Sequence, residues 1–446
     1  MNMKRTFARA FATAAVAFAA QAAFAAIPIQ HWTQAGGAKI YLIESQVIPM
    51  VDVQVDFDAG GRRDPADKQG LASVSAAMMS RGLAARGSDA ALDENQLSEA
   101  WADLGASFGG SAGSDRLSFS LRSLNYPDLL PKAVALAARQ LAEPSFPEHV
   151  WLRDRARMSA SIREANTRPA TLAARAYTAA VYSGHPYGYE TTEESLGRIA
   201  VADMRAWHTA ALLPCRAKVS IVGAVTRAQA DQIAATLLSR LPAAAACPAL
   251  PPVAEVPPLA APVERKIPFE SAQAHVFIGQ PGHKRDDPDF FPLLVGNYIL
   301  GGGGFVSRLT TEVREKRGLT YSTYSYFSPG MHAGAFTVGL QTRPDQAAQA
   351  VQVASDVVAK FVAEGPTQEE LKAAKDNLIG GFALRIDSNR KLLDNVANIA
   401  WHDLPLTYLD TWTKEVGKVG AADIRAAMQR KVQPQKMVTV VVGGKP

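Results

Sequence analysis

The chain has 446 residues, 20% of them charged, and a formal net charge of +5 at pH 7. Three of those charges come from Lys4, Arg5 and Arg9 at the extreme N-terminus, and without them the charge falls to +2. With so little excess charge and no clustered basic face, the composition argues against a nucleic-acid-binding protein. The length predicts more than one domain.

The N-terminus has the pattern of a secretory signal peptide. The basic head is followed by an alanine-rich apolar run over residues 10–20, and Ala23-Phe24-Ala25 places small residues at −3 and −1 of a cleavage site. This predicts a signal peptide over residues 1–25, cleaved after Ala25, with a buried N-terminal helix as the alternative. No cysteine follows the cleavage point and no run of 18 apolar residues follows Ala26. We therefore expect a periplasmic or secreted protein without a membrane anchor.

Strand patterns occur early in the chain and again late in it. Val51, Val53, Val55 and Phe57 alternate with polar residues, which predicts a half-buried strand. Phe336, Val338 and Leu340 repeat this alternation in the second part of the chain. Helix-period runs follow, one of which stops at Gly365, and Thr367 with Glu370 then predicts a capping box at the start of the next helix. Strands followed by helices predict an α+β fold, with antiparallel-type sheets and helices packed on one face.

Two overlapping Gly-x-Ser-x-Gly patterns between Gly105 and Gly113 match the nucleophile elbow of serine hydrolases. That elbow needs a strand before the serine and a helix after it. Here Leu117, Phe119 and Leu121 continue in strand alternation, so a glycine-rich turn or strand entry is the better interpretation. A serine hydrolase stays as a third functional hypothesis, testable with a serine-directed probe.

The two cysteines of the chain, Cys215 and Cys247, flank one predicted strand–helix segment. In an oxidising compartment they can form a disulfide, and the alternative is two free, buried thiols. Two cysteines are too few for a structural metal site.

A proline- and alanine-rich stretch over residues 242–266 contains seven prolines and predicts an extended linker. It separates an N-terminal domain (26–241) from a C-terminal domain (267–446). The two parts repeat each other at an offset of about 220 residues: Ala202-Asp203-Met204-Arg205-Ala206 returns as Ala422-Asp423-Ile424-Arg425-Ala426, and Val222-Gly223 as Val442-Gly443. Several matches in one register indicate a duplication.

One segment of the first copy resembles a known zinc site that has lost its ligands. Gly60-Gly61-Arg62, Gly70-Leu71-Ala72, Met78 and Gly82 resemble the segment of the pitrilysin/insulinase family of metallopeptidases that carries the inverted zinc motif His-x-x-Glu-His. At the motif positions this chain has Ser73, Ala76 and Ala77, which offer neither an imidazole nor a carboxylate. The family's third ligand, a glutamate, is missing near residues 160–163. His185-Pro186-Tyr187-Gly188 resembles a family turn further on. We expect no zinc and no other cofactor in this chain.

The second copy keeps a feature that the resemblance connects with catalysis. Arg314 and Tyr321 resemble the arginine–tyrosine motif of the family's C-terminal half, which implies that both side chains donate to the substrate carbonyl or its oxyanion. The Phe305, Leu309 and Val313 stripe predicts a helix up to about Arg317, with Tyr321 opening the next strand. The alternative is a solvated basic helix end beside a core tyrosine.

Upstream of the arginine lie four glycines, Gly301, Gly302, Gly303 and Gly304, without a phosphate-binding motif. The resemblance implies a flexible loop near the substrate channel, and an ordinary turn is the alternative.

The resemblance covers roughly residues 30–446 and implies two homologous domains that form half of a clamshell. Its first functional hypothesis is a non-catalytic subunit of a heterodimeric periplasmic metallopeptidase. Such a subunit would contribute Arg314 and Tyr321 to an active, zinc-bearing homologue that hydrolyses peptides. The rival hypothesis is a peptide-binding or scaffold protein with no role in peptide hydrolysis.

Overall fold

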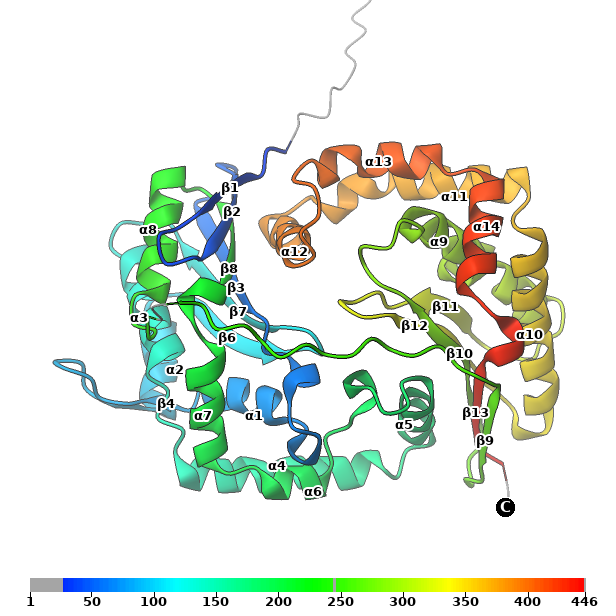
Figure 1. Ribbon diagram of the computed structural model, residues 1–446, viewed down its shortest axis with the longest axis horizontal. Coiled ribbons are helices and arrows are strands. Elements are labelled where there is room, and N and C mark those ends of the chain that lie inside the picture. The colour runs from blue at the N-terminus through cyan, green and yellow to red at the C-terminus, as the bar shows by residue number, and fades with distance from the viewer. Residues whose placement is uncertain (1–26, 244–245, 445–446) are drawn as a thin grey trace, which may run out of the picture.

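The computed structural model describes residues 27–243 and 246–444, so the predicted signal peptide lies outside the described residues. Two α/β halves lie side by side (Figure 1), and each contains one large sheet. The described part of the connection between them has neither helix nor strand before Val263, where strand β9 (Val263–Ile267) begins. The connection therefore ends four residues before the predicted boundary at 266, because residues from Val263 onward pair with the last strand of the chain.

The N-terminal half has a six-stranded sheet in the order β1-β2-β8-β3-β7-β6. Strands β2 and β8 are parallel, and the other neighbours are antiparallel. Its strands are β1 (Gln30–Thr33), β2 (Lys39–Glu44), β3 (Met50–Phe57), β6 (Ser107–Ala112), β7 (Leu117–Leu124) and β8 (Lys218–Gly223), with a separate short pair, β4 (Gly82–Leu83) and β5 (Leu92–Asp93). Its helices are α1 (Leu71–Met78), α2 (Glu94–Asp103), α3 (Leu130–Ala142), α4 (Glu148–Ala165), α5 (Pro169–Val181), α6 (Glu193–Arg198), α7 (Val201–Ala211) and α8 (Arg227–Leu238).

The C-terminal half has a five-stranded sheet in the order β11-β12-β10-β13-β9, in which only β9 and β13 are parallel among the described strands. The remaining strands are β10 (Ala274–His283), β11 (Thr323–Phe327), β12 (Gly334–Thr342) and β13 (Val438–Val442). The helices are α9 (Phe290–Asn297), α10 (Ala347–Glu364), α11 (Gln368–Gly380), α12 (Asn389–Trp401), α13 (Tyr408–Lys418) and α14 (Ala421–Lys431), with π-helical turns η5 (Tyr298–Gly302) and η7 (Thr310–Glu315).

The two halves repeat each other at the offset read from the sequence. Helices α5 and α12 begin at residues 169 and 389, α7 and α14 at 201 and 421, and β8 and β13 at 218 and 438. The predicted capping box is also present, since the Thr367 side chain accepts from the Glu370 amide at the start of α11. Gly365, at a φ of 75°, ends α10 as the sequence predicts. The predicted α+β class with two homologous domains is confirmed.

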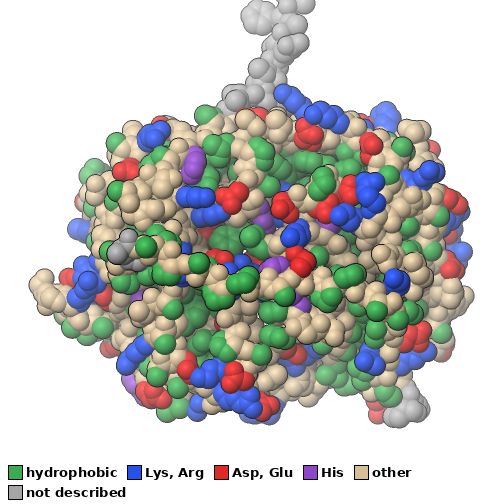
Figure 2. Space-filling model, viewed as in Figure 1, with side chains coloured by type: hydrophobic (Ala, Val, Ile, Leu, Met, Phe, Trp, Pro, Cys, Tyr) green, Lys and Arg blue, Asp and Glu red, His purple; other side chains and the backbone are tan. Residues whose placement is uncertain are grey.

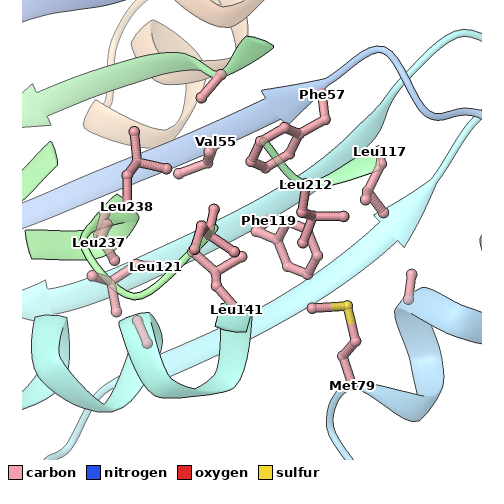
Figure 3. Packing of buried hydrophobic residues seen from close by; sticks show 14 of the residues in the cluster. Val55, Phe57, Met79, Leu117, Phe119, Leu121, Leu141, Leu212, Leu237 and Leu238 are labelled. Atoms are coloured by element: carbon pink, nitrogen blue, oxygen red, sulfur yellow. The ribbon is translucent and has the colours of Figure 1, made fainter. Parts of the chain in front are cut away.

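Each half has its own apolar core between its sheet and its helices. In the N-terminal half, Val55, Phe57, Phe119 and Leu121 point from the sheet toward Leu141, Leu237 and Leu238 on the helices (Figure 3). The corresponding core of the C-terminal half lies under α9, α10, α11, α13 and α14. These cores use the apolar sides of the alternating strands, which is why the period-2 pattern was readable from the sequence.

The second face of each sheet is covered by a helix from the other half. Helix α12 packs on β8 and β3 of the N-terminal sheet, and α5 packs on β10 and β13 of the C-terminal sheet (Figure 1). The prediction of a half-buried strand at 51–57 is therefore wrong. Asp52, Gln54 and Asp56 are all buried, because α12 lies over the side of β3 that the pattern left for solvent. Asp56 accepts hydrogen bonds from Gln54 and Ser118, and its burial raises its pKa.

Candidate functional site

The helix that carries Ser73, Ala76 and Ala77 is capped at its start by a buried carboxylate. Both carboxylate oxygens of Asp64 cap the start of α1, accepting from the amides of Gly70 and Ala72 at 3.0 Å each. Gly70 has a φ of 102°, and a Cβ there would lie 2.7 Å from the Thr191 side chain. Burial raises the pKa of Asp64 to about 6 although its backbone donors act in the opposite direction. Helix α1 is thus fixed at its start by contacts within the chain.

The side chains on this helix cannot bind zinc. Ser73 and Ala77 are exposed and lie one turn apart, and Ala76 is buried. A hydroxymethyl and two methyl groups offer none of the nitrogen, sulfur or carboxylate ligands that zinc requires. On α4, Ser161 is exposed at the expected place of the third ligand. Within residues 27–243 and 246–444 there is no group of three or more His, Cys, Asp or Glu side chains that could hold a metal ion.

The serine patterns between Gly105 and Gly113 do not form a nucleophile elbow. Ser107 and Ser111 lie inside β6, which pairs antiparallel with β7 and is the edge strand of its sheet. Helix α1 packs beside this edge strand. The strand interpretation of this segment is confirmed, and the strand–turn–helix context of a serine hydrolase is missing here.

Arg314 and Tyr321 lie together on the surface of the C-terminal half. The guanidinium carbon of Arg314 is 4.8 Å from the ring centroid of Phe305 and 5.1 Å from that of Tyr321, so the cation lies between two aromatic rings. Tyr321 is 81% exposed, which contradicts the alternative of a core tyrosine. No carboxylate of the described residues forms an ion pair with Arg314 within 4.0 Å. The pair is therefore positioned by stacking, with Tyr321 largely exposed and Arg314 half-buried.

The predicted helix around this pair is wrong at its start, and the strand after it begins later than predicted. Phe305 belongs to a 3-10 turn and is exposed, whereas Leu309 and Val313 are buried as the stripe requires. Gly304, at a φ of 63°, opens this turn, and the extended Ser307 separates the turn from the helical segment that follows. That segment is mostly the π-helical turn η7, and Tyr321 lies two residues before β11 rather than opening it. A π-helical turn has a different residue spacing from an α-helix, so a 3.6-residue stripe predicts it only in part.

The glycine run has a packing role at its first position. Gly301 is buried in η5, and a Cβ there would lie 2.5 Å from the backbone nitrogen of Ser325 in β11. A side chain at Gly303 would similarly approach the Tyr298 carbonyl oxygen at 2.8 Å. Glycine is thus required at these two positions by close contact. The flexibility of the loop stays a prediction.

A hydrogen-bonded cluster at the centre of the molecule joins the two halves, and the sequence did not reveal it. The Tyr187 hydroxyl donates to Asp115 at 2.6 Å and accepts from the His332 amide, and Asp115 also accepts from the Met331 amide. Arg62 pairs with the same carboxylate at 3.0 Å. The resemblance marked Arg62 and the turn at 185–188 separately, but gave no sign that they come together. Asp115 is a single acidic residue in a hairpin turn, and nothing in the sequence around it indicates its partners.

Cys215 and Cys247 form a disulfide, with their Cα atoms 5.9 Å apart. The bond ties the 3-10 turn before β8 to the start of the connection between the halves. A second tie to the connection comes from His185, whose Nε2 donates to the Ala254 carbonyl while Nδ1 accepts from the Tyr187 amide. Arg216 and Arg63 also donate to the carbonyls of Pro248 and Pro251, so several contacts fasten the connection to the N-terminal half. None of the helices in the described ranges is both long and apolar enough to cross a membrane.

Comparison with known proteins agrees with this geometry. Residues 39–195 match the family model of insulinase (peptidase family M16), and residues 198–378 match that of the peptidase M16 inactive domain. The crystal structure of a peptidase M16 inactive domain from Pseudomonas fluorescens is 33% identical in sequence. It superposes with a TM-score of 0.87 over 94% of this chain and 98% of that one.

Two curated relatives have names that point in different directions. The non-peptidase homolog YmxG of Helicobacter pylori is 25% identical over 417 residues, which are 92% of this chain and 93% of that protein. An uncharacterized zinc protease of Streptomyces coelicolor is 31% identical over 174 residues, and this match spans only 39% of this chain and 37% of that protein. With both family models and a full-length structural match at 33% identity, the chain belongs to peptidase family M16, the insulinase family, as an inactive-type member.

Proposed function

We propose that this chain is the non-catalytic subunit of a heterodimeric zinc metallopeptidase, and that it completes the active site of a zinc-bearing homologue. The observation that carries this proposal is the contrast between the two halves. Ser73 and Ala77 remove every ligand from a helix that is otherwise preserved, whereas Arg314 and Tyr321 still expose hydrogen-bond donors. A chain without any role in peptide hydrolysis would have no need of the hydrogen-bond donors of Arg314 and Tyr321.

The proposed contribution of the pair is electrostatic. The Tyr321 hydroxyl and the Arg314 guanidinium both donate, and together they can bind a peptide carbonyl and the oxyanion that develops from it. Stacking between Phe305 and Tyr321 holds the guanidinium in place before the substrate arrives, so little reorganisation is needed in the transition state. Zinc in the partner would supply the activated water.

The test is reconstitution with the zinc-bearing homologue. Tyr321→Phe deletes one hydroxyl and keeps the ring that stacks on Arg314, so assembly should be unchanged. Loss of one oxyanion donor typically lowers turnover by roughly 100- to 1000-fold, which is the upper expectation here. Arg314→Lys keeps the charge and loses the planar fork, and it should also lower turnover. Complex formation is measured by analytical ultracentrifugation and peptide hydrolysis by a fluorogenic assay.

Tyr324→Phe is the matched control, because Tyr324 is also exposed, lies on the neighbouring strand β11 and stacks on Tyr326 rather than on Arg314. It should leave turnover unchanged. Normal assembly with full activity in both Tyr321→Phe and Arg314→Lys would contradict the proposal.

The rival function, peptide binding without hydrolysis, is favoured by β6. This glycine-containing strand is the edge of its sheet and lies beside α1, so its outer backbone groups can pair with an extended peptide. Peptide capture by the isolated chain, together with full activity of both mutants above, would support the rival. We place either function in the periplasm or outside the cell, in line with the predicted leader and the disulfide.

A further inference from the structure

Two adjoining cavities lie where the halves meet. One, of about 330 Å³, is lined by the turn at 113–116, Tyr187, Trp401 and His402. The other, of about 290 Å³, is lined by residues of the C-terminal half that include Arg285, and the two cavities share Pro329 and Asn398 in their walls. In the view of Figure 2, the surface is hollowed near the centre of the molecule, and basic, acidic and histidine side chains lie around the hollow.

Arg285, in the wall of the smaller cavity, is a buried cation without an anionic partner. It is 7% exposed, and its guanidinium carbon lies 3.7 Å from the centroid of the Phe290 ring. Its one side-chain hydrogen bond among the described residues runs from Nη2 to the Tyr408 hydroxyl, at 2.6 Å. No carboxylate of the described chain forms an ion pair with it within 4.0 Å. Of the nearby acids, Asp289 pairs with Arg430 and Asp287 with Lys431, while Asp286 is exposed and forms no ion pair with Arg285.

An unneutralised buried charge is costly, and such groups are normally paired. A guanidinium has five N–H donors in a planar fork that fits the two oxygens of a carboxylate, and Tyr408 uses only one of them. The remaining wall is mostly apolar, with Phe290, Leu294 and Phe327. Burial lowers the pKa of the His283 imidazole in this wall, which favours its neutral form. The cavity thus combines one cation with an apolar surface.

The charge of Arg285 is also felt in the larger cavity. The pKa of His402 is lowered to about 4, first by burial and then by the positive charge of Arg285. Arg116 and Lys218 act on the imidazole in the same direction, and only Asp115 opposes them. Arg116 and Lys218 form ion pairs with Asp56 and Asp403, whereas Arg285 has no ion pair among the described residues and is left for an anion to neutralise.

We propose that Arg285 and the cavity beside it bind the carboxylate of a ligand whose adjoining group is aromatic or aliphatic, such as the C-terminal residue of a peptide. About 290 Å³ corresponds to roughly ten water molecules, which suits a single large residue. The carboxylate lies against the guanidinium, and the adjoining side chain lies against Phe290, Leu294 and Phe327. The site lies within this chain alone, so its test involves no partner subunit and is independent of the role of Tyr321.

The experiment measures binding of matched acids and amides to the full chain by calorimetry. The probes are N-acetyl-L-phenylalanine and its amide, and the tetrapeptide Ala-Ala-Ala-Phe with a free or an amidated C-terminus. The acids should bind at least ten times more tightly than the amides. Arg285→Met keeps an apolar stem against Phe290 and should weaken acid binding about 10- to 100-fold, the range for hydrogen bonds to a charged group. Arg285→Lys should retain part of the affinity for the acids.

Arg385→Met is the control for the loss of one stacked arginine. Arg385 lies 5.5 Å from the Trp412 ring centroid, is exposed and lines neither cavity. It should bind the acids as the unmodified protein does. Binding of the small acid without binding of the tetrapeptide would support the site and assign it to free carboxylic acids.

A second readout needs no change at Arg285. A carboxylate bound there offsets the charge that acts on His402, so the pKa of His402 should rise from about 4 when the acid is present. Ring signals of His402, assigned by their loss in His402→Gln, report this in an NMR pH titration. Equal binding of acid and amide, or no binding of either at millimolar concentration, would overturn the proposal.

Discussion

Lys218 provides the sharpest test of how the two halves are held together. It lies on β8 of the N-terminal half, and its ammonium donates to the carbonyls of Ala400 and Trp401 at 2.7 and 3.2 Å. These carbonyls end α12, which belongs to the other half, so Lys218 is a helix C-cap supplied across the interface. The ammonium also contacts Asp403 at 3.0 Å.

The change Lys218→Met removes this cap and keeps most of the aliphatic side chain. Hydrogen bonds from a charged donor contribute about 1.5–3 kcal/mol each. Burial of the Lys218 side chain, which is only 16% exposed, offsets part of two such bonds. Asp403 is 65% exposed, so that ion pair adds at most about 1 kcal/mol. We expect a net loss of about 2–3 kcal/mol in the free energy of opening α12, which is a roughly 30- to 150-fold faster amide exchange.

The assay is hydrogen–deuterium exchange of the amides in α12, because local opening is well defined even where a chain of this size does not unfold in one step. Lys39→Met is the matched control. Lys39 pairs with Lys218 in the register of β2 and β8 and contacts Asp403 at 3.7 Å, but it does not reach the helix carbonyls. Its removal should change exchange in α12 less than twofold. Equal effects of the two changes would refute the capping argument.

Three further outcomes are expected. The purified, dialysed chain should contain no stoichiometric zinc by elemental analysis, because Ser73 and Ala77 cannot replace imidazoles, and one retained equivalent would contradict this. Titration in denaturant should find no free thiol before reduction; reducing the Cys215–Cys247 bond, whose cysteines are 32 residues apart, should cost up to about 3–4 kcal/mol of stability, and two thiols without reductant would rule the bond out. The Asp64 carboxyl binds its proton more tightly in the folded protein than in the unfolded chain. The stabilisation that comes from this proton is fully present below pH 3.8 and is lost as the pH rises through about 6. Asp64→Asn should flatten that dependence in exchange measurements on α1, and an unchanged profile would exclude this carboxyl as its cause.

The duplicated fold was readable from the sequence because it rests on local patterns. The alternation at 51–57, the capping box at Thr367 and the recurring segments 202–206 and 422–426 each report the structure of their own neighbourhood. The packing of α5 and α12 on the sheet of the opposite half has no such local signal in the sequence. A helix that crosses to the other half carries the same 3.6-residue period as one that stays, so the pattern does not say which sheet the helix covers.

The candidate sites divide in the same way. Ser73, Ala77, Arg314 and Tyr321 could be named because a motif places them at fixed spacing along the chain. Arg285 could not, since its significance depends on what is absent around it in three dimensions. In the sequence, Arg285 and the acidic residues after it resemble an ordinary solvated loop. Only the structure shows that Asp287 and Asp289 are paired with other cations.

Because α5 and α12 each cover the sheet of the opposite half, they affect both the folding of the protein during synthesis and its behaviour after proteolysis. During synthesis, the polar side of β3 stays uncovered until residues 389–401 leave the ribosome, so the N-terminal half completes its native packing almost last. A protease that cuts the connection near residue 250 would leave two fragments that still cover each other's sheets. Such a nicked chain should migrate as one particle in native electrophoresis and as two bands only after denaturation. Neither fragment produced alone would have a partner helix for its sheet.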